Sequence, residues 1–217
     1  MSEVRQHRFK PASGAADLLL IRHGETQAAV RGQSFPMLKG QGDPVLRPEG
    51  EAQAHAVCAR LQQEPIKTIY VTSLQRTHQT AAPLAQALGV EPRVEADLRE
   101  IFLGDWEGGE FRFRAAQNDP AYVRARAEQE WGELPGAETT AALHTRVKAG
   151  LQRIAAAHAD ELVAVVVHGG VVAAALSIAT GSPAFAFQGA DNGSISRLVV
   201  HGEQMILRGF NDVSHLR

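Results

Sequence analysis

Two continuous hydrophobic runs are the clearest pattern in the chain, at residues 18–21 and 162–167. Uninterrupted apolar stretches of this length are typical of strands that are buried on both faces of a sheet. A shorter run at 68–71 predicts a third strand. Between 194 and 207, hydrophobic and polar residues alternate on both sides of Gly202, which predicts two closing strands.

Between these runs, hydrophobic residues recur at the three- and four-residue spacing of amphipathic helices. This spacing predicts a helix that begins at Pro48, a helix that ends at Gly89, a helix around 143–154 and a helix of small residues over 169–180. Strands that alternate with helices imply a mostly parallel sheet. The predicted fold class is therefore α/β, a three-layer sandwich whose mostly parallel central sheet has helices on both faces.

The remaining segments lack a clear period. Residues 1–16 predict a flexible N-terminal arm, and residues 31–50, rich in glycine and proline, predict a long loop. Residues 102–136 are polar and contain several aromatic side chains, as expected of a lid-like excursion over the core. No repeat or change in composition divides the chain, so we expect residues 17–217 to form a single domain.

Composition and charge exclude several classes of protein. The 217 residues carry 22 Lys and Arg against 24 Asp and Glu, a formal net charge of −2. Hydrophobic residues at 44% and charged residues at 21% exclude a chain that is disordered throughout. The near balance of charge argues against nucleic acid or an anionic membrane as a partner bound through a broad basic field. No apolar stretch approaches the ~18 residues of a membrane span.

The single cysteine, Cys58, allows no internal disulfide, which suits the reducing cytosol. It shares the helical spacing of Ala54, Val57 and Leu61, so we expect a buried structural thiol. The first apolar run is too short for a signal peptide, which favours a cytoplasmic protein. The chain has no His-Glu-x-x-His, Asp-x-Asp or paired-cysteine motif, so we expect no metal and no cofactor.

Three predicted strands are followed by residues that suit phosphate. Residues 18–21 lead into Arg22-His23-Gly24-Glu25-Thr26, residues 68–71 are followed by Arg76, and residues 162–167 lead into His168-Gly169-Gly170. Each residue alone is more often structural, but parallel strands bring their carboxyl ends to one edge of a sheet, where ligands bind. There, arginine forks match phosphate oxygens, and backbone N–H groups at Gly169 can approach the same anion.

These residues resemble the signature of the histidine phosphatase superfamily, which includes cofactor-dependent phosphoglycerate mutase. The resemblance spans about residues 17–216 and continues in family order through four further segments. They are Thr72-Ser73-Leu74-Gln75-Arg76-Thr77-His78, Leu98-Arg99-Glu100 with Gly104-Asp105-Trp106-Glu107-Gly108, Val167-His168-Gly169-Gly170 and Phe210-Asn211-Asp212.

The resemblance implies a role for each residue of the site. His23 is the nucleophile that is transiently phosphorylated, Arg22, Arg76 and His168 bind the phosphoryl group, and Glu100 is the general acid and base. Simple electrostatics agrees, because two guanidiniums near His23 oppose its protonation and so lower its pKa. Glu25 is the rival acid, but its place directly after the strand directs it away from the leaving group.

The sequence also departs from the family pattern. Many members carry Asn six residues after the nucleophile, where this chain has Ala29. Either another polar group, from the loop at 31–44, takes its place, or the phosphate pocket is looser. Within 102–136, four arginines suit either a second anion or a solvated helix face, and five aromatic side chains suit either a cavity entrance or packing of a lid. They are Arg112, Arg114, Arg124 and Arg126, and Phe102, Trp106, Phe111, Phe113 and Trp131.

We interpret the chain as a metal-independent phosphoric monoester hydrolase that acts on a small phosphorylated metabolite. The mutase pattern of Tyr-Gly with nearby Asn-Lys is absent after Glu100, and the ending Asn211-Asp212 with His215-Leu216 resembles the phosphatase branch. Two alternatives stay open, a phosphoglycerate-type phosphomutase and a non-catalytic module that binds phosphate or protein. A homodimer is the default expectation for a soluble enzyme of this kind.

Overall fold

A six-stranded sheet runs through the centre of the computed structural model, which describes residues 5–217. Its strands are β1 (Ala16–Arg22), β4 (Ile66–Val71), β5 (Arg93–Val94), β6 (Leu162–Val167), β7 (Ile195–His201) and β8 (Gln204–Asp212). They lie in the order β5-β4-β6-β1-β7-β8. The first four in this order are parallel, whereas β7 is antiparallel to β1 and β8 is antiparallel to β7.

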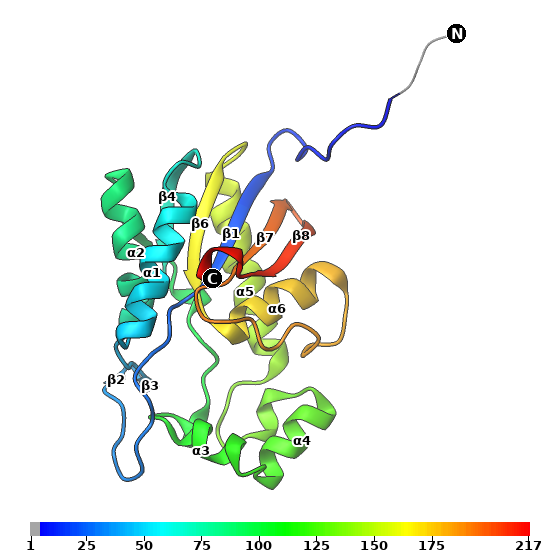
Figure 1. Cartoon of the computed structure of the whole chain (residues 1–217). Coiled ribbons are helices and arrows are strands. Elements are labelled where there is room, and N and C mark those ends of the chain that lie inside the picture. Colours follow the sequence, from blue (N-terminus) through cyan, green and yellow to red (C-terminus); the bar gives the residue numbers. More distant parts are fainter. Residues whose placement is uncertain (1–4) are drawn as a thin grey trace.

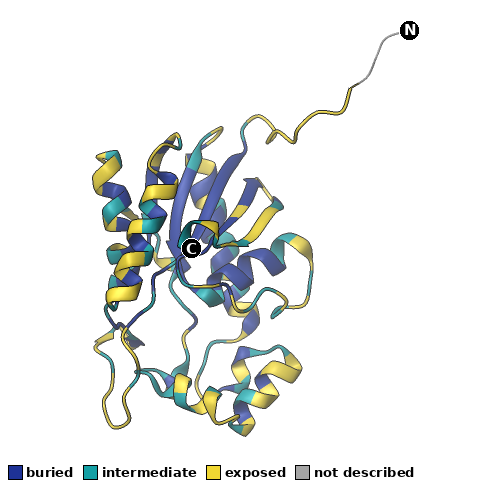
Figure 2. Ribbon diagram, in the orientation of Figure 1, coloured by how far each residue is buried: buried dark blue, intermediate teal, exposed yellow. Residues whose placement is uncertain are grey.

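The central strands β1 and β6 are buried on both faces, as their continuous hydrophobic runs predict (Figure 2). They pair in parallel with Leu18 beside Val163. Because successive side chains of a strand point to opposite faces, Leu18 and Leu20 pack into one hydrophobic cluster and Leu19 and Ile21 into another. The sheet therefore separates two cores, and each core needs a layer of helices to cover it.

Two pairs of helices form these outer layers (Figure 1). Helices α1 (Pro48–Leu61) and α2 (Gln75–Leu88) cover one face, and α5 (Thr140–Ala157) and α6 (Gly169–Thr180) cover the other. Pro48 occupies the first turn of α1, and Gly89 ends α2 in the left-handed conformation with φ 65°. The structure thus confirms the predicted three-layer α/β sandwich.

Residues 102–136 lie beyond the edge where the parallel strands end (Figure 1). They contain the 3-10 turns η2 (Gly104–Trp106) and η3 (Trp131–Glu133) and the short helices α3 (Glu110–Ala116) and α4 (Pro120–Glu128). Trp106, Trp131 and Leu134 bury their side chains in the same cluster as α5 and α6. The outer surface of α3 and α4 is exposed (Figure 2).

The structure refines several predicted elements. The loop at 31–50 contains a short hairpin, β2 (Met37–Leu38) with β3 (Gln41–Gly42), and α1 begins within its last residues. Strand β4 begins two residues before the predicted run, and β8 continues to Asp212. Two further 3-10 turns, η1 (Ala96–Leu98) and η4 (Ser214–Leu216), follow β5 and β8.

Two other expectations concern the arm and the thiol. Of the predicted arm, residues 1–4 lie outside the described residues. Residues 5–12 form neither helix nor strand, and β1 already begins at Ala16.

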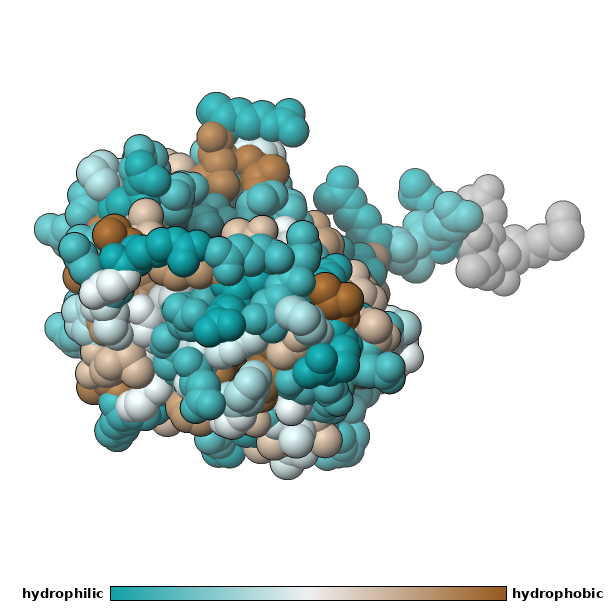
Figure 3. All heavy atoms as spheres, turned by 90° about the horizontal axis from the view of Figure 1, so that it is seen from below, coloured by the Kyte–Doolittle hydropathy of each residue, from teal (hydrophilic) through white to brown (hydrophobic). Residues whose placement is uncertain are grey.

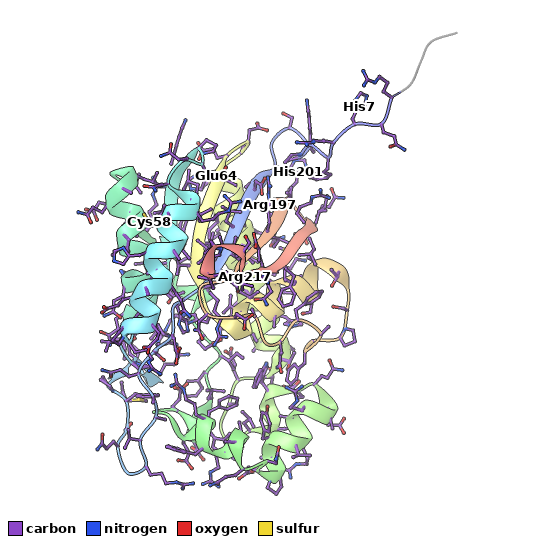
Figure 4. The ribbon with its side chains drawn as sticks, in the orientation of Figure 1. His7, Cys58, Glu64, Arg197, His201 and Arg217 are labelled. Atoms are coloured by element: carbon purple, nitrogen blue, oxygen red, sulfur yellow. The ribbon has the colours of Figure 1, made fainter. Side chains whose placement is uncertain are left out.

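Cys58, labelled on α1 in Figure 4, is partly rather than fully buried, because it lies at the border of the apolar face of the helix. No helix within residues 5–217 is long and apolar enough to cross a membrane.

The start of α1 touches the loop that follows β1, and two glycines make this contact possible. A Cβ atom on Gly50 would lie 2.1 Å from the Glu25 carbonyl oxygen, and a Cβ atom on Gly24 would lie 2.4 Å from the Gly50 carbonyl oxygen. Real Cβ atoms do not approach backbone this closely. The absence of side chains at both positions therefore sets the path of the loop that carries His23.

We predict that Gly50→Ala lowers the free energy of unfolding by about 1–3 kcal/mol, because the added methyl group displaces backbone. Alanine is otherwise the better helix former by about 1 kcal/mol, so a net loss shows that the steric contact dominates. Urea denaturation measures the change. Gly209→Ala is the control, since nothing lies within 4 Å of its Cβ position. A Gly50→Ala protein as stable as the wild type would contradict the account.

Candidate active site

The structure brings residues from all three strand ends to one cavity of about 870 Å³, although His168 is fully buried and is not among the residues that line it. Arg22, His23, Arg76, Glu100 and Gly169 all line it. It lies between the sheet edge and the segment 102–136, toward the lower end of the molecule in Figure 1. Seen from that end, the surface is mainly polar, with hydrophobic residues in small groups (Figure 3).

The backbone of His23 is held from two sides of the sheet edge. Its N–H donates to the Val167 carbonyl at 2.9 Å, and its own carbonyl accepts from Asn192 Nδ2 at 2.8 Å. The next residue donates its N–H to Thr80 Oγ1 at 2.9 Å. These contacts fix the His23 backbone relative to β6, α2 and the segment before β7.

The ring of His23 is fixed in one tautomer by its own loop. Its Nδ1 lies 2.7 Å from the Gly24 carbonyl oxygen. Because a carbonyl oxygen only accepts, Nδ1 carries the hydrogen, and in the neutral ring the lone pair is on Nε2. Burial, and then the charges of Arg76 and Arg22, hold the pKa of His23 well below its ordinary value. His23 is therefore a neutral imidazole with Nε2 available as a nucleophile.

His168 lies beside His23, with 5.2 Å between the ring centroids and an angle of 63° between the rings. Its Nε2 is 3.0 Å from Thr72 Oγ1, while its buried Nδ1 has no hydrogen-bond partner within residues 5–217. Burial, and then the charge of Arg76, hold the pKa of His168 well below its ordinary value. A buried polar atom without a partner is costly, so Nδ1 suits a hydrogen bond to a ligand.

The two predicted arginines approach from different strand ends. Arg22 donates Nη1 to the Ala190 carbonyl, and its buried Nε has no partner in the described part of the chain. Arg76, in the first turn of α2, donates Nη1 to the Gly42 carbonyl at 3.0 Å and lies 3.8 Å from Asp43. Arg22 forms no ion pair within residues 5–217. Two guanidiniums with so little compensation favour an anion between them.

Gly169 and Gly170 allow these side chains to pack against the start of α6. A Cβ atom on Gly169 would lie 3.3 Å from Arg22 Nε, and a Cβ atom on Gly170 would lie 2.6 Å from Glu100 Oε1. The Gly169 N–H lies at the beginning of the twelve-residue helix α6, where backbone donors are not used within the helix. The helix start therefore contributes to the wall of the cavity as the sequence predicts.

The charge of Glu100 acts on both Arg22 and Arg76, and hydrogen bonds hold the loop that carries it. One oxygen of its side chain accepts the Ile101 N–H at 3.0 Å. Its carbonyl accepts from Gln41 Nε2 at 2.7 Å and from Arg146 Nη2 at 3.0 Å. Glu25, the rival acid, points away from the cavity and pairs with Arg47 at 3.0 Å.

The carboxy-terminal motif positions the segment that passes behind His23. Asn211 donates Nδ2 to Asp191 at 2.8 Å and accepts the Asp191 N–H at 2.7 Å. His215 bonds to the Gly193 carbonyl at 2.9 Å, and the Gly193 N–H donates to the Arg22 carbonyl at 3.0 Å. The terminal residues therefore contact the site only indirectly, through the backbone of the segment 191–193. Neither Asn192 nor Arg146 was identified from the sequence.

The four arginines of the segment 102–136 divide into two kinds. Arg112 and Arg126 line the cavity, whereas Arg114 pairs with Glu110 and Asp119, and Arg124 pairs with Glu133. The loop at 31–44 does supply a polar side chain, Gln41, but its amide donates to the Glu100 and Ile101 carbonyls. Arg112, and not this loop, therefore provides the additional cation beside His23.

The aromatic side chains also divide between the two expected roles. Trp106, Phe111 and Trp131 line the cavity, and Phe35, Tyr122 and Phe185 join them. The Trp131 and Phe185 rings are 4.7 Å apart between centroids, which makes the wall continuous from the segment 102–136 to the loop after α6. Phe102 is exposed, and neither Phe102 nor Phe113 lines this cavity. The prediction that these two side chains belong to an aromatic entrance was therefore wrong.

Within residues 5–217, no group of three or more His, Cys, Asp or Glu side chains is arranged to hold a metal ion.

The second carboxylate on the cavity wall, Glu107, accepts hydrogen bonds from the N–H groups of Gly42 at 2.7 Å and Leu103 at 2.9 Å. Burial raises the pKa of Glu107. This side chain therefore connects β3 to the segment 102–136.

The lowered pKa of both buried histidines predicts acid sensitivity of the fold. Below about pH 6.5, each of these two rings binds a proton in the unfolded chain but not in the folded chain. As the pH is lowered in this range, the free energy of unfolding therefore decreases by up to ~1.4 kcal/mol per pH unit for each histidine. We expect His23→Gln to remove one histidine's share of this slope, as measured by urea denaturation at several pH values. A slope equal to that of the wild type would show that His23 titrates normally in the folded protein.

Comparison with known proteins agrees with this geometry. Residues 18–213 match the model of the histidine phosphatase superfamily (branch 1). A metal-independent phosphoserine phosphatase of Arabidopsis thaliana is 32% identical over 212 residues, covering 95% of this chain and 86% of that protein. Phosphoglycerate mutase-like protein 4 of the same plant is 31% identical over 205 residues, covering 93% and 87%.

The solved structure of a mycobacterial glucosyl-3-phosphoglycerate phosphatase is also similar, with a TM-score of 0.75 and 28% sequence identity. The matched region covers 91% of this chain and 99% of the mycobacterial chain. The family model covers most of the chain, and the motifs of the strand ends lie within it. The chain therefore belongs to branch 1 of the histidine phosphatase superfamily.

Proposed function

We propose that the protein is a phosphoric monoester hydrolase that works through a phosphohistidine on His23. The observation that carries this proposal is the neutral imidazole of His23, with its Nε2 lone pair in a cavity lined by Arg22, Arg76 and Glu100. A protonated imidazole could not attack phosphorus, and a neutral imidazole without nearby cations would face a repulsive dianion.

In the first step, Nε2 of His23 attacks the phosphorus atom in line with the ester oxygen. The P–O bond breaks, Glu100 gives its proton to the leaving oxygen, and the alcohol departs. Arg22, Arg76, His168 and the Gly169 N–H contact the three equatorial oxygens, whose charge is spread in the transition state.

In the second step, water takes the place of the alcohol. Glu100, now a carboxylate, removes a proton from the water as its oxygen attacks phosphorus. The P–N bond breaks, inorganic phosphate forms and the neutral imidazole is restored. The Nδ1–H bond to the Gly24 carbonyl keeps the same tautomer through both steps. Each role needs only groups that the chain itself carries, so the proposed reaction is independent of metal ions.

Proteins named for both activities are similar to this chain, including a metal-independent phosphoserine phosphatase and a phosphoglycerate mutase-like protein. The absence of the mutase pattern after Glu100 favours a phosphatase. The cavity also suits an ester whose alcohol part is larger than the phosphoryl group. Its aromatic wall, which includes Phe111, Trp131 and Phe185, provides apolar surface beyond the arginines. We propose a small phosphorylated metabolite as substrate, with its phosphoryl group at His23 and its alcohol part along this wall.

We predict that the wild type hydrolyses p-nitrophenyl phosphate, that chelators leave the rate unchanged and that vanadate inhibits it. His23→Ala should lower kcat by at least about 10³-fold, because the nucleophile is lost. His201→Ala is the matched control and should keep the wild-type rate, because His201 is exposed on β7 at the opposite edge of the sheet (Figure 4). Equal rates for His23→Ala and the wild type would exclude the mechanism.

A further inference from the structure

Arg112 reaches the loop that carries His23 from a distant part of the chain. It lies in the first turn of α3, and its guanidinium donates Nη2 to Thr26 Oγ1 at 2.6 Å and Nη1 to the Gln27 carbonyl at 2.7 Å. Its side chain lines the cavity together with Arg22 and His23. The segment 102–136 therefore contributes a cation to the wall that the phosphoryl group would face.

No carboxylate in the described part of the chain forms an ion pair with this cation, although the charge of Glu25 acts on it from a greater distance. No ion pair within residues 5–217 includes Arg112, whereas its neighbours Arg114 and Arg124 both pair with acids. Burial, and then the charge of Arg22, lower the pKa of Arg112. A partly buried guanidinium facing other cations is costly unless an anion binds there.

The orientation of Arg112 is fixed before any ligand binds. Its guanidinium lies 5.0 Å from the centroid of the Phe35 ring, in the geometry of a cation–π contact. A guanidinium has five N–H donors, and the two bonds to Thr26 and Gln27 leave three for a ligand. Arg112 is therefore held in position with donors remaining, as a phosphate ligand requires.

Small residues make room for this arrangement. A Cβ atom on Gly109 would lie 3.1 Å from the Phe35 ring and 3.2 Å from Ala29 Cβ. The start of α3 therefore lies close to the loop at 29–35, and a side chain at Gly109 would press against Phe35 and Ala29. By the resemblance to the superfamily, Ala29 stands where many members carry an asparagine of the phosphate pocket. Arg112 bonds to Thr26 and Gln27 in the same loop.

We propose that Arg112 contacts the transferred phosphoryl group as a third guanidinium, replacing the polar side chain that is absent at Ala29. This inference rests on the proposed function of the cavity and adds a catalytic residue to it. It also means that the segment 102–136 takes part in phosphoryl binding itself, in addition to forming the wall along the alcohol part of the substrate. The alternative ligand for Arg112 is an anionic group on the alcohol part.

The test uses ligands that carry no anionic alcohol part, namely inorganic phosphate as inhibitor and p-nitrophenyl phosphate as substrate. We expect Arg112→Gln to raise the Ki of phosphate about tenfold or more and to lower kcat/KM about 10²-fold. Arg112→Lys keeps the charge but loses the planar fork, so its Ki should lie between those of Arg112→Gln and the wild type. Arg124→Gln is the control and should change neither constant more than twofold.

A Ki of phosphate that is unchanged in Arg112→Gln would overturn the inference, and Arg112 would then serve the alcohol part or the packing of α3. A cooperative thermal melt of each variant without phosphate confirms that the protein measured is folded. If Arg112→Gln does not fold, a wild-type Ki in Arg112→Lys overturns the inference equally. A wild type that neither binds phosphate nor hydrolyses the ester would instead refute the proposed function.

Discussion

The arrangement around His23 depends on keeping its imidazole uncharged among positive charges. Burial removes the water that would stabilise an imidazolium, and Arg76 and Arg22 oppose the same charge. The Gly24 carbonyl then selects the tautomer by accepting from Nδ1. Burial and the two arginines lower the pKa of His23, and the bond to the Gly24 carbonyl opposes them only in part. The cationic surroundings that suit a phosphate dianion therefore also keep the imidazole of His23, the proposed nucleophile, neutral. An acid close to the ring would weaken both effects, and Glu25 is held away by Arg47.

The fold supplies this environment by close backbone approaches at the sheet edge. Gly24 and Gly50 allow α1 to touch the loop after β1, and Gly169 and Gly170 allow Arg22 and Glu100 to pack on the start of α6. At Gly24, Gly50 and Gly170 a β-carbon would enter a space that another atom occupies, and at Gly169 it would press on the Arg22 side chain. The central strands bury their side chains in two separate cores. The free energy gained from this burial stabilises the sheet edge from which the loop extends.

Much of the fold could be predicted from local sequence. The buried strand β6 and helix α6 were predicted with the bounds that they have, because a continuous apolar run and a glycine pair mark them clearly. Arg22 ends β1, and His23 and His168 directly follow β1 and β6, so the direction of a parallel sheet was enough to place them at one edge. Short strands such as β2 and β3 have too few residues to show a period.

The rest of the site depends on contacts that leave no local pattern. Arg112 and Arg126 face the cavity while Arg114 and Arg124 do not, although all four lie on the same two short helices. Their spacing alone does not show which face of each helix meets the cavity. Asn192 acts through the backbone of His23, and such a contact between distant segments does not depend on a recognisable motif.

The most direct test of the account is to trap the phosphorylated protein during turnover. The wild type would be mixed with p-nitrophenyl phosphate labelled with ³²P and quenched in alkali within milliseconds, and the labelled peptide would be identified. The account predicts label on His23 that is stable in alkali, is lost in acid and forms at least as fast as kcat. Turnover without labelled protein, or label on another residue, would contradict the central claim that His23 is the nucleophile.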